Sequence, residues 1–210
     1  MAMGGSRRRR VWFGLAVLGA TAPLLVSTSA GAAGPQVKEP KYGFTFTLPS
    51  NWKTVPLNGS DIKSLLNSAT HNDPSMASAL SAQVKSAVEQ GVKVFAIGPE
   101  ANGSVPNVSI IDGSAAGSPK GSAFPPAAVT QAKISLTQVG ATHIQAAVVT
   151  NKMGDTAEVV YELPLKTGTV EGAQLYVQHK SRVLVMTVTT TSSANSQAAA
   201  RSIVKSWKWK

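Results

Sequence analysis

The chain contains no cysteine. Disulfide bonds, thiol catalysis and the lipid-attachment cysteine of many bacterial envelope proteins are therefore excluded. Histidine is scarce, with 3 residues among 210, and charged residues make up only 14% of the chain. Hydrophobic residues make up 43%, which is ample for a packed interior and argues against global disorder. The length fits one domain plus a short leader.

Sequence motifs for catalysis and cofactor binding are also missing. No phosphate-binding Gly-x-x-x-x-Gly-Lys-Ser/Thr or Gly-x-Gly-x-x-Gly occurs, so we expect no nucleotide cofactor. A serine hydrolase commonly places its nucleophile in Gly-x-Ser-x-Gly. The stretch Gly113-Ser114-Ala115-Ala116-Gly117 misplaces the serine by one residue. We therefore expect that the protein is not an enzyme and binds no cofactor.

The three histidines do not predict a metal site. His71 lies close to Asp73, but a polar turn in which Asp73 caps the next helix explains this pair without a metal. His143 and His179 lie on or at the ends of predicted strands and would face each other if those strands paired. Two imidazoles without a suitably spaced carboxylate are a weak basis for a metal site, so we predict none.

Two carboxylates could in principle support glycosidase chemistry. Glu158 and Glu162 are four residues apart on one predicted strand. They would share a face but lie roughly 13 Å apart along the strand, beyond the 5 to 10 Å or so that such chemistry needs. We interpret them as solvated surface charges and assign no catalytic residue.

The N-terminus has the three regions of a secretory signal peptide. Basic residues Arg7, Arg8, Arg9 and Arg10 precede the apolar run 11–26, and small residues that include Ala30 and Ala32 follow it. A retained membrane anchor is the alternative, but the apolar run has 16 residues, interrupted by glycines and a proline, against roughly 20 that are needed to span a bilayer. We therefore expect cleavage in the region of Ala30 and Ala32.

The small residues allow the mature chain to begin at Gly31 or at Ala33. The Arg9-Arg10 pair also loosely resembles a twin-arginine signal, so both the general and the twin-arginine export routes remain open. We predict a cleaved signal peptide over 1–32, a short linker over 33–41 and one domain over 42–210. The mature protein is expected to be extracytoplasmic, with no stable membrane span.

The net charge is positive even without the leader. The full chain carries +10, and removing the four leader arginines leaves 16 Lys and Arg against 10 Asp and Glu, or +6. Outside the cell this charge favours an anionic envelope component over nucleic acid. The basic residues are scattered, however, which is typical of a solvated surface.

Strand and helix patterns alternate along the domain. The segment 42–49 alternates apolar and small polar residues with a period of two, typical of a half-buried strand. Helices are predicted from Pro74 to before Gly91, over 126–139 before Gly140, and from about Ser192 to Ser206. The other predicted strands are 92–97, 107–112, 142–150, 157–165, 170–179 and 182–190, the last four forming an antiparallel meander.

Less regular segments lie between and after these elements. Residues 61–69 are weakly helical, and 113–125 is predicted to be a mobile loop. Trp207 is expected to pack beneath the last helix while 208–210 fray. The alternative for the aromatic and basic ending is a membrane-surface or single-strand-binding tail.

The opening Tyr42-Gly43-Phe44-Thr45-Phe46-Thr47-Leu48-Pro49, then Trp52, the meander and the closing Ile203-Val204-Lys205-Ser206-Trp207 together resemble the PsbP/Mog1-like family. The resemblance covers roughly 42–207. It implies an α+β fold, an α/β/α sandwich with a central, mainly antiparallel sheet. It also implies binding or assembly without catalysis, although no functional residue carries over, and fold alone says little about function.

We therefore expect an exported, non-catalytic binding or accessory protein. Its partner would be an unknown protein or an anionic envelope component, and not nucleic acid. The alternative is a carrier that holds a small apolar ligand between sheet and helices, because small side chains on the meander could leave room for one.

Overall fold

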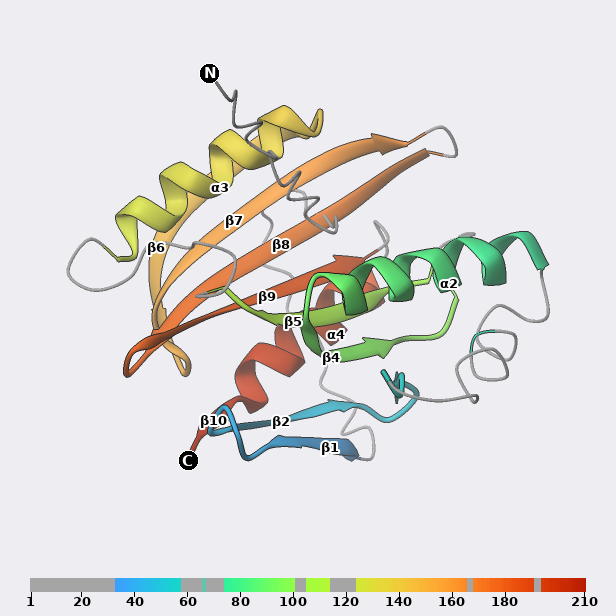
Figure 1. Cartoon of the computed structure of the whole chain (residues 1–210), viewed down its shortest axis with the longest axis horizontal. Coiled ribbons are helices and arrows are strands. Elements are labelled where there is room, and N and C mark those ends of the chain that lie inside the picture. Colours follow the sequence, from blue (N-terminus) through green and yellow to red (C-terminus); the bar gives the residue numbers. More distant parts are fainter. Residues whose placement is uncertain are drawn as a thin grey trace, which may run out of the picture.

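The computed structural model describes residues 33–57, 66, 74–100, 105–113, 124–165, 168–190 and 194–210. Figure 1 shows the arrangement of the elements in these ranges. In chain order they are β1 (Ala33–Glu39), β2 (Phe44–Pro49), β3 (Lys53–Thr54), α2 (Pro74–Glu89), β4 (Val92–Ile97), β5 (Asn107–Asp112), α3 (Pro126–Gln138), β6 (Thr142–Asn151), β7 (Gly154–Leu165), β8 (Gly168–His179), β9 (Arg182–Thr190), α4 (Ala194–Ser206) and β10 (Lys208–Trp209). None of the helices in the described ranges is long and apolar enough to cross a membrane.

The main sheet has seven strands in the order β3-β4-β5-β9-β8-β7-β6, and each neighbouring pair is antiparallel. The predicted meander of β6, β7, β8 and β9 is confirmed. Tight hairpins connect the successive strands of this meander. Between β8 and β9, His179 pairs with Arg182 across a two-residue turn, in which Lys180 has φ +55°. Such a turn needs positive φ to match the twist of the strands.

The predicted strand over 42–49 is present as β2 but does not join the main sheet. It forms a second antiparallel sheet in the order β1-β2-β10. The strand pattern over 42–49 therefore belongs to a second sheet, beside the central sheet that the resemblance implies. A period of two tells which residues share a face of a strand, but it does not tell which strand lies alongside.

Two segments expected to be irregular are the partners of β2. Residues 33–39 were predicted as part of a linker but form β1, because Pro35 lies on an edge strand, where a missing N–H group is tolerated. The ending was predicted to fray after Trp207, but Lys208 and Trp209 form β10. The Trp209 indole N–H donates to the Met153 carbonyl at 2.9 Å, which fixes this end of the chain.

Helices cover both faces of the main sheet. One face packs against α4 and β2, where Ile203, Trp207, Phe44 and Phe46 join one buried cluster with strand residues such as Met186. We call this the α4 face. On the opposite face α3 packs against β6 and β7, and α2 packs against β4. The predicted α/β/α sandwich is confirmed.

Helices α2 and α3 end just before the glycines from which their ends were predicted. Gly91 and Gly140 have φ of +76° and +83° just after α2 and α3, the left-handed conformation that ends helices at little cost in glycine. In α3, Ala132 and Leu136 are buried, whereas Val88 near the end of α2 is 41% exposed. Residues 61–65, 67–69 and 114–123 lie outside the described ranges, and with them most of the weak helix and the loop.

Candidate functional site

The two ends of the main sheet differ in length. At one end β3 has only two residues, whereas at the other β6 has ten. β6 pairs with β7 on its inner side, and no described strand pairs with its outer side. An edge of this kind presents unpaired N–H and C=O groups to any further strand. β6 is therefore the longest open edge in the described part of the chain.

β6 has few of the features that protect edge strands from pairing. Proline and lysine are absent from Thr142–Asn151, and the central Ala146-Ala147-Val148-Val149 is uncharged. Val148 is 48% exposed. Lysine, proline and bulges are the usual means by which proteins block such edges. β6 has only a bulge, and it lies at the start of the strand.

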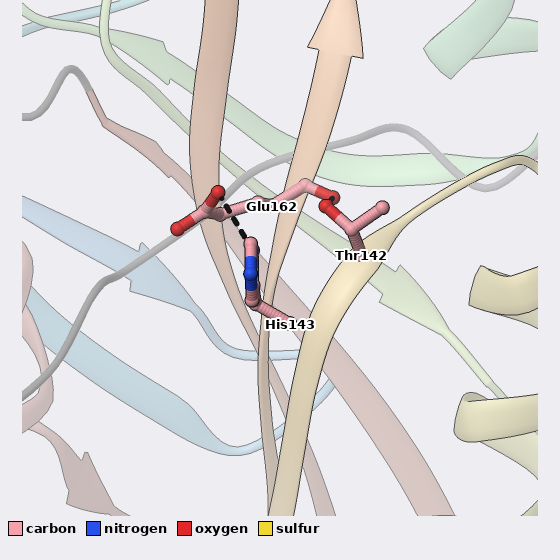
Figure 2. Close-up of polar contacts among 3 residues, drawn as sticks. All are labelled: Thr142, His143 and Glu162. Atoms are coloured by element: carbon pink, nitrogen blue, oxygen red, sulfur yellow. Dashed lines mark hydrogen bonds and ion pairs between the residues drawn. The ribbon is translucent and has the colours of Figure 1, made fainter.

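That bulge positions His143. The register with β7 shifts between Thr142 and Gln145, and His143 has φ +48°, which is uncommon for a residue other than glycine. Figure 2 shows the imidazole turned across β7 towards Glu162, with Nδ1 2.9 Å from Oε2 of the carboxylate. The Thr142 hydroxyl donates to the Glu162 carbonyl at 3.4 Å. The bulge thus holds an exposed histidine against a carboxylate at the sheet edge.

Acidic side chains gather on the strand beside this edge. Alternate residues of β7 such as Val159 and Tyr161 pack under α3, so Glu158 and Glu162 point to the α4 face. Glu171 of β8 is the direct partner of Glu162. Burial raises the pKa of Glu158 above its ordinary value. Glu158 is half-buried, so a cation placed beside it would favour its ionised form.

The structure does not assemble a catalytic or metal-binding centre from these groups. His143 is about three-quarters exposed, and its imidazole contacts the single carboxylate of Glu162. Among the described residues, no group of three or more His, Cys, Asp or Glu could hold a metal ion. Glu158 and Glu162 share a face, as predicted from their spacing.

The structure does not bring His143 and His179 together. They lie on β6 and β8, which are separated by β7 and do not pair. The His179 ring instead stacks on Trp209, with ring centroids 4.1 Å apart and planes 5° apart. Burial, with a smaller contribution from Lys180, lowers the pKa of His179. The possibility that the two histidines face each other is thus excluded.

Several residues considered in the sequence lie outside the described ranges. These are His71, Asp73, Ser114, the leader arginines Arg7, Arg8, Arg9 and Arg10, and the cleavage-region residues Ala30 and Ala32. By contrast, Trp207 is 2% exposed and stacks on Phe44 at 4.4 Å. The packing of Trp207 is confirmed, and Trp209 also has a structural contact in place of a frayed end.

The edge role of β6 and the His143–Glu162 contact were not found from the sequence. The alternating pattern identifies β6 as a strand but does not show that it ends the sheet. The bulge depends on one extra residue between Thr142 and Gln145, and no glycine marks it. The polar residues and alanines that make up most of 142–151 are the one sequence signal that could have indicated an edge.

No protein-family model and no curated protein matches the chain. Among solved structures it is similar to cyanobacterial PsbP (CyanoP) from Synechocystis, with 13% identity, a TM-score of 0.50, and coverage of 90% of this chain and 100% of that chain. A protein from Bacteroides thetaiotaomicron is 11% identical with a TM-score of 0.47. That similarity covers 84% of this chain and 48% of the other, so the chain spans about half the length of that protein.

LpqN of Mycobacterium tuberculosis, described as involved in cell envelope biogenesis, is 10% identical, with a TM-score of 0.39 and coverage of 83% of this chain and 84% of that chain. The similarity to CyanoP, at 13% identity, concerns the fold alone. It agrees with the antiparallel main sheet and the helices described above. The fold of this chain is therefore PsbP/Mog1-like, as predicted.

Proposed function

We propose that the chain is an exported, non-catalytic binding protein that holds an extended segment of a partner protein along the outer edge of β6. The observation that carries the proposal is the ten-residue open edge, with its uncharged centre and its exposed Val148. The export part rests on the leader, with Arg7 to Arg10 before an apolar run.

Strand addition suits this edge physically. Main-chain hydrogen bonds to an added strand supply affinity, and alternate side chains supply specificity. Val148 pairs with Ala157, on the face covered by α3, whereas Ala147 pairs with Glu158, on the α4 face. An added strand would therefore meet apolar contacts on one face and carboxylates on the other.

The charge beside the edge favours a segment with lysine or arginine at alternate positions. Glu158 and Glu162 lie one strand inward on the α4 face. An added strand would lie two strands, roughly 10 Å, from β7, and the long side chain of a lysine or arginine can reach over Ala147 to these carboxylates. An anionic envelope component remains the second candidate partner, supported by the net charge of +6 after the leader, and it would bind away from this edge.

The apolar-carrier alternative has less support. On the face of the main sheet that carries α2 and α3, the described apolar side chains pack into one cluster with α3 and a second cluster with α2. No observation favours an apolar ligand over a filled core, so carriage of such a ligand stays a prediction of the sequence.

Site-specific crosslinking in the producing cell tests the proposal. A photo-reactive amino acid is placed at Val148 on β6 or at Ile134 on α3, which is a matched control because it is 50% exposed. We expect a defined protein partner to crosslink at 148 and not at 134. Val148→Lys should abolish that partner's binding to the purified protein while Ile134→Lys leaves it unchanged, because an edge lysine blocks strand addition.

Three results would contradict the proposal. Equal crosslinking at both positions would mean that the edge has no special role. Crosslinking of 148 only to a second copy would replace the partner by a homodimer. Retained binding in Val148→Lys would show that the partner binds elsewhere.

A further inference from the structure

Polar side chains occupy the middle of the main sheet on the face that carries α2 and α3. One row of directly paired residues runs across five strands in the order Phe95, Ser109, Thr187, Gln174 and Val159. Its two ends are apolar and its three central residues are polar. Directly paired residues in antiparallel strands share a face, so these side chains lie in one line.

The next row has a similar pattern. It runs through Ile97, Asn107, Thr189, Gly172 and Tyr161. Again the ends are large and the centre is polar or small. We call Asn107, Ser109, Gln174, Thr187 and Thr189 the central polar patch.

The central polar patch lies between the two helices. At one end of the rows, Phe95 and Ile97 belong to a buried cluster with Leu80 and Val84 of α2. At the other end, Val159 and Tyr161 belong to a separate cluster with residues of α3. Figure 1 shows β8 and β9 passing between the places where α2 and α3 lie. The two apolar clusters are thus separated by buried polar groups.

The hydrogen bonds of the patch are incomplete. The Thr189 hydroxyl donates to Asn107 Oδ1 at 3.0 Å. The Tyr176 hydroxyl donates to Gln174 Oε1 at 2.9 Å, and burial raises the pKa of Tyr176 well above its ordinary value, which keeps this donor protonated. Gln174 Nε2 has no partner in the part of the chain that the structure describes, although Gln174 is only 1% exposed.

The orientation assigned to the Gln174 amide does not explain why Nε2 lacks a partner. If the Gln174 amide were rotated by half a turn, Nε2 would meet the Tyr176 hydroxyl and Oε1 would lose its partner. One end of the amide is unpaired in either case. Buried polar groups in folded proteins are nearly always hydrogen-bonded, so an unpaired one indicates a missing partner.

We propose that the central polar patch binds a small neutral molecule that carries an amide, whose carbonyl oxygen accepts a hydrogen bond from Gln174 Nε2. The hydroxyl of Thr187, directly opposite Gln174, is placed to bond the rest of the amide. A neutral ligand fits because the patch contains no charged side chain that could pair with an ion. Ser109, which is only partly buried, marks the more open side of the patch. The inference is independent of strand addition at β6.

Side-chain amide NMR of the mature protein tests the proposal directly. Acetamide and N-acetylglucosamine are the probes, since both are neutral and present an amide carbonyl. We expect the Gln174 side-chain NH₂ resonances to shift saturably with at least one probe. The NH₂ resonances of Gln145, an exposed glutamine on β6, serve as the control in the same spectrum and should not shift.

Variants separate binding from packing. Gln174→Met should weaken probe binding by about tenfold or more, the loss expected when a buried donor is removed. Thr187→Val has nearly the same shape and covers the case in which Gln174→Met does not fold. It should weaken binding several-fold. Unchanged affinity in a folded variant would overturn the proposal.

Two further results would also overturn it. One is the absence of any shift of the Gln174 resonances with either probe at saturating concentration. The other is a tightly bound water that contacts Gln174 Nε2 and is not displaced by the probes, because the missing partner would then be structural.

Discussion

The position of Glu158 in the sheet determines the pKa of its carboxyl group. The sequence indicates only a carboxylate on a strand, four residues from another one. The structure places it on the α4 face between Ala147 and Leu175, its partners on β6 and β8. Burial among these apolar neighbours raises its pKa.

We predict that Glu158→Gln stabilises the protein at neutral pH. The folded pKa lies above the ordinary value of 4.5, so ionised Glu158 destabilises the fold at pH values above the folded pKa. The penalty disappears as the pH falls through the folded pKa to below 4.5, because both states are then protonated. Urea unfolding at pH 7 and pH 4 should therefore show a gain that is present at the higher pH and absent at the lower.

Glu89→Gln is the control, because Glu89 is an exposed acid at the end of α2. It should change the free energy of unfolding little at either pH. An equal gain in both variants would mean that net charge, and not burial at 158, is responsible.

At the scale of elements, the sequence predicts most strands and helices but not their neighbours. Segments 92–97, 107–112 and 182–190 form strands with the predicted bounds, because valine, isoleucine and threonine dominate them. β1 and β10 were missed because Gly34-Pro35 is typical of a spacer and because β10 has only two residues. The His143–Glu162 contact and the central polar patch depend on strand order and register, which a local pattern does not specify.

We predict that deletion of residues 208–210 destabilises the protein by about 2–3 kcal/mol. The deletion removes β10, the Trp209 stacking on His179 and the Trp209 hydrogen bond to Met153. It also removes the bond from the Lys210 amide to the Gly43 carbonyl at 2.8 Å. Chemical denaturation of the truncated and full-length mature proteins measures the difference.

The control for this deletion is Lys208→Ala, which keeps the backbone of β10 and removes only an exposed side chain. It should shift the free energy of unfolding by less than about 0.5 kcal/mol. A deletion with no larger effect than this would indicate an ending that frays, as the sequence alone suggested.

At the scale of the whole molecule, two antiparallel sheets enclose α4, and α2 and α3 cover the far side of the larger sheet. This arrangement leaves one long edge open at β6 and one polar region between α2 and α3. A leader cleaved in the region of Ala30 and Ala32 would leave β1 intact, because β1 begins at Ala33.

We predict that the protein recovered outside the producing cell begins at Gly31 or Ala33. Either start removes the arginine-rich leader and preserves the pairing of β1 with β2. Intact mass and N-terminal sequencing of the recovered protein decide between the two. A start at Met1 in the membrane fraction would indicate a retained anchor, and a start beyond Glu39 would show that β1 is not part of the mature fold.

Hydrogen exchange along β6 tests the central claim of strand addition most directly. The tagged full-length chain is purified from producing cells with and without its bound partner, and exchange of backbone amides over Thr142–Asn151 is compared. We predict that the outward amides of β6 exchange rapidly in the unbound protein and slowly in the complex, while the other edge strand, β3, is unchanged. Equal exchange of β6 in both states, or protection confined to other elements, would contradict the account.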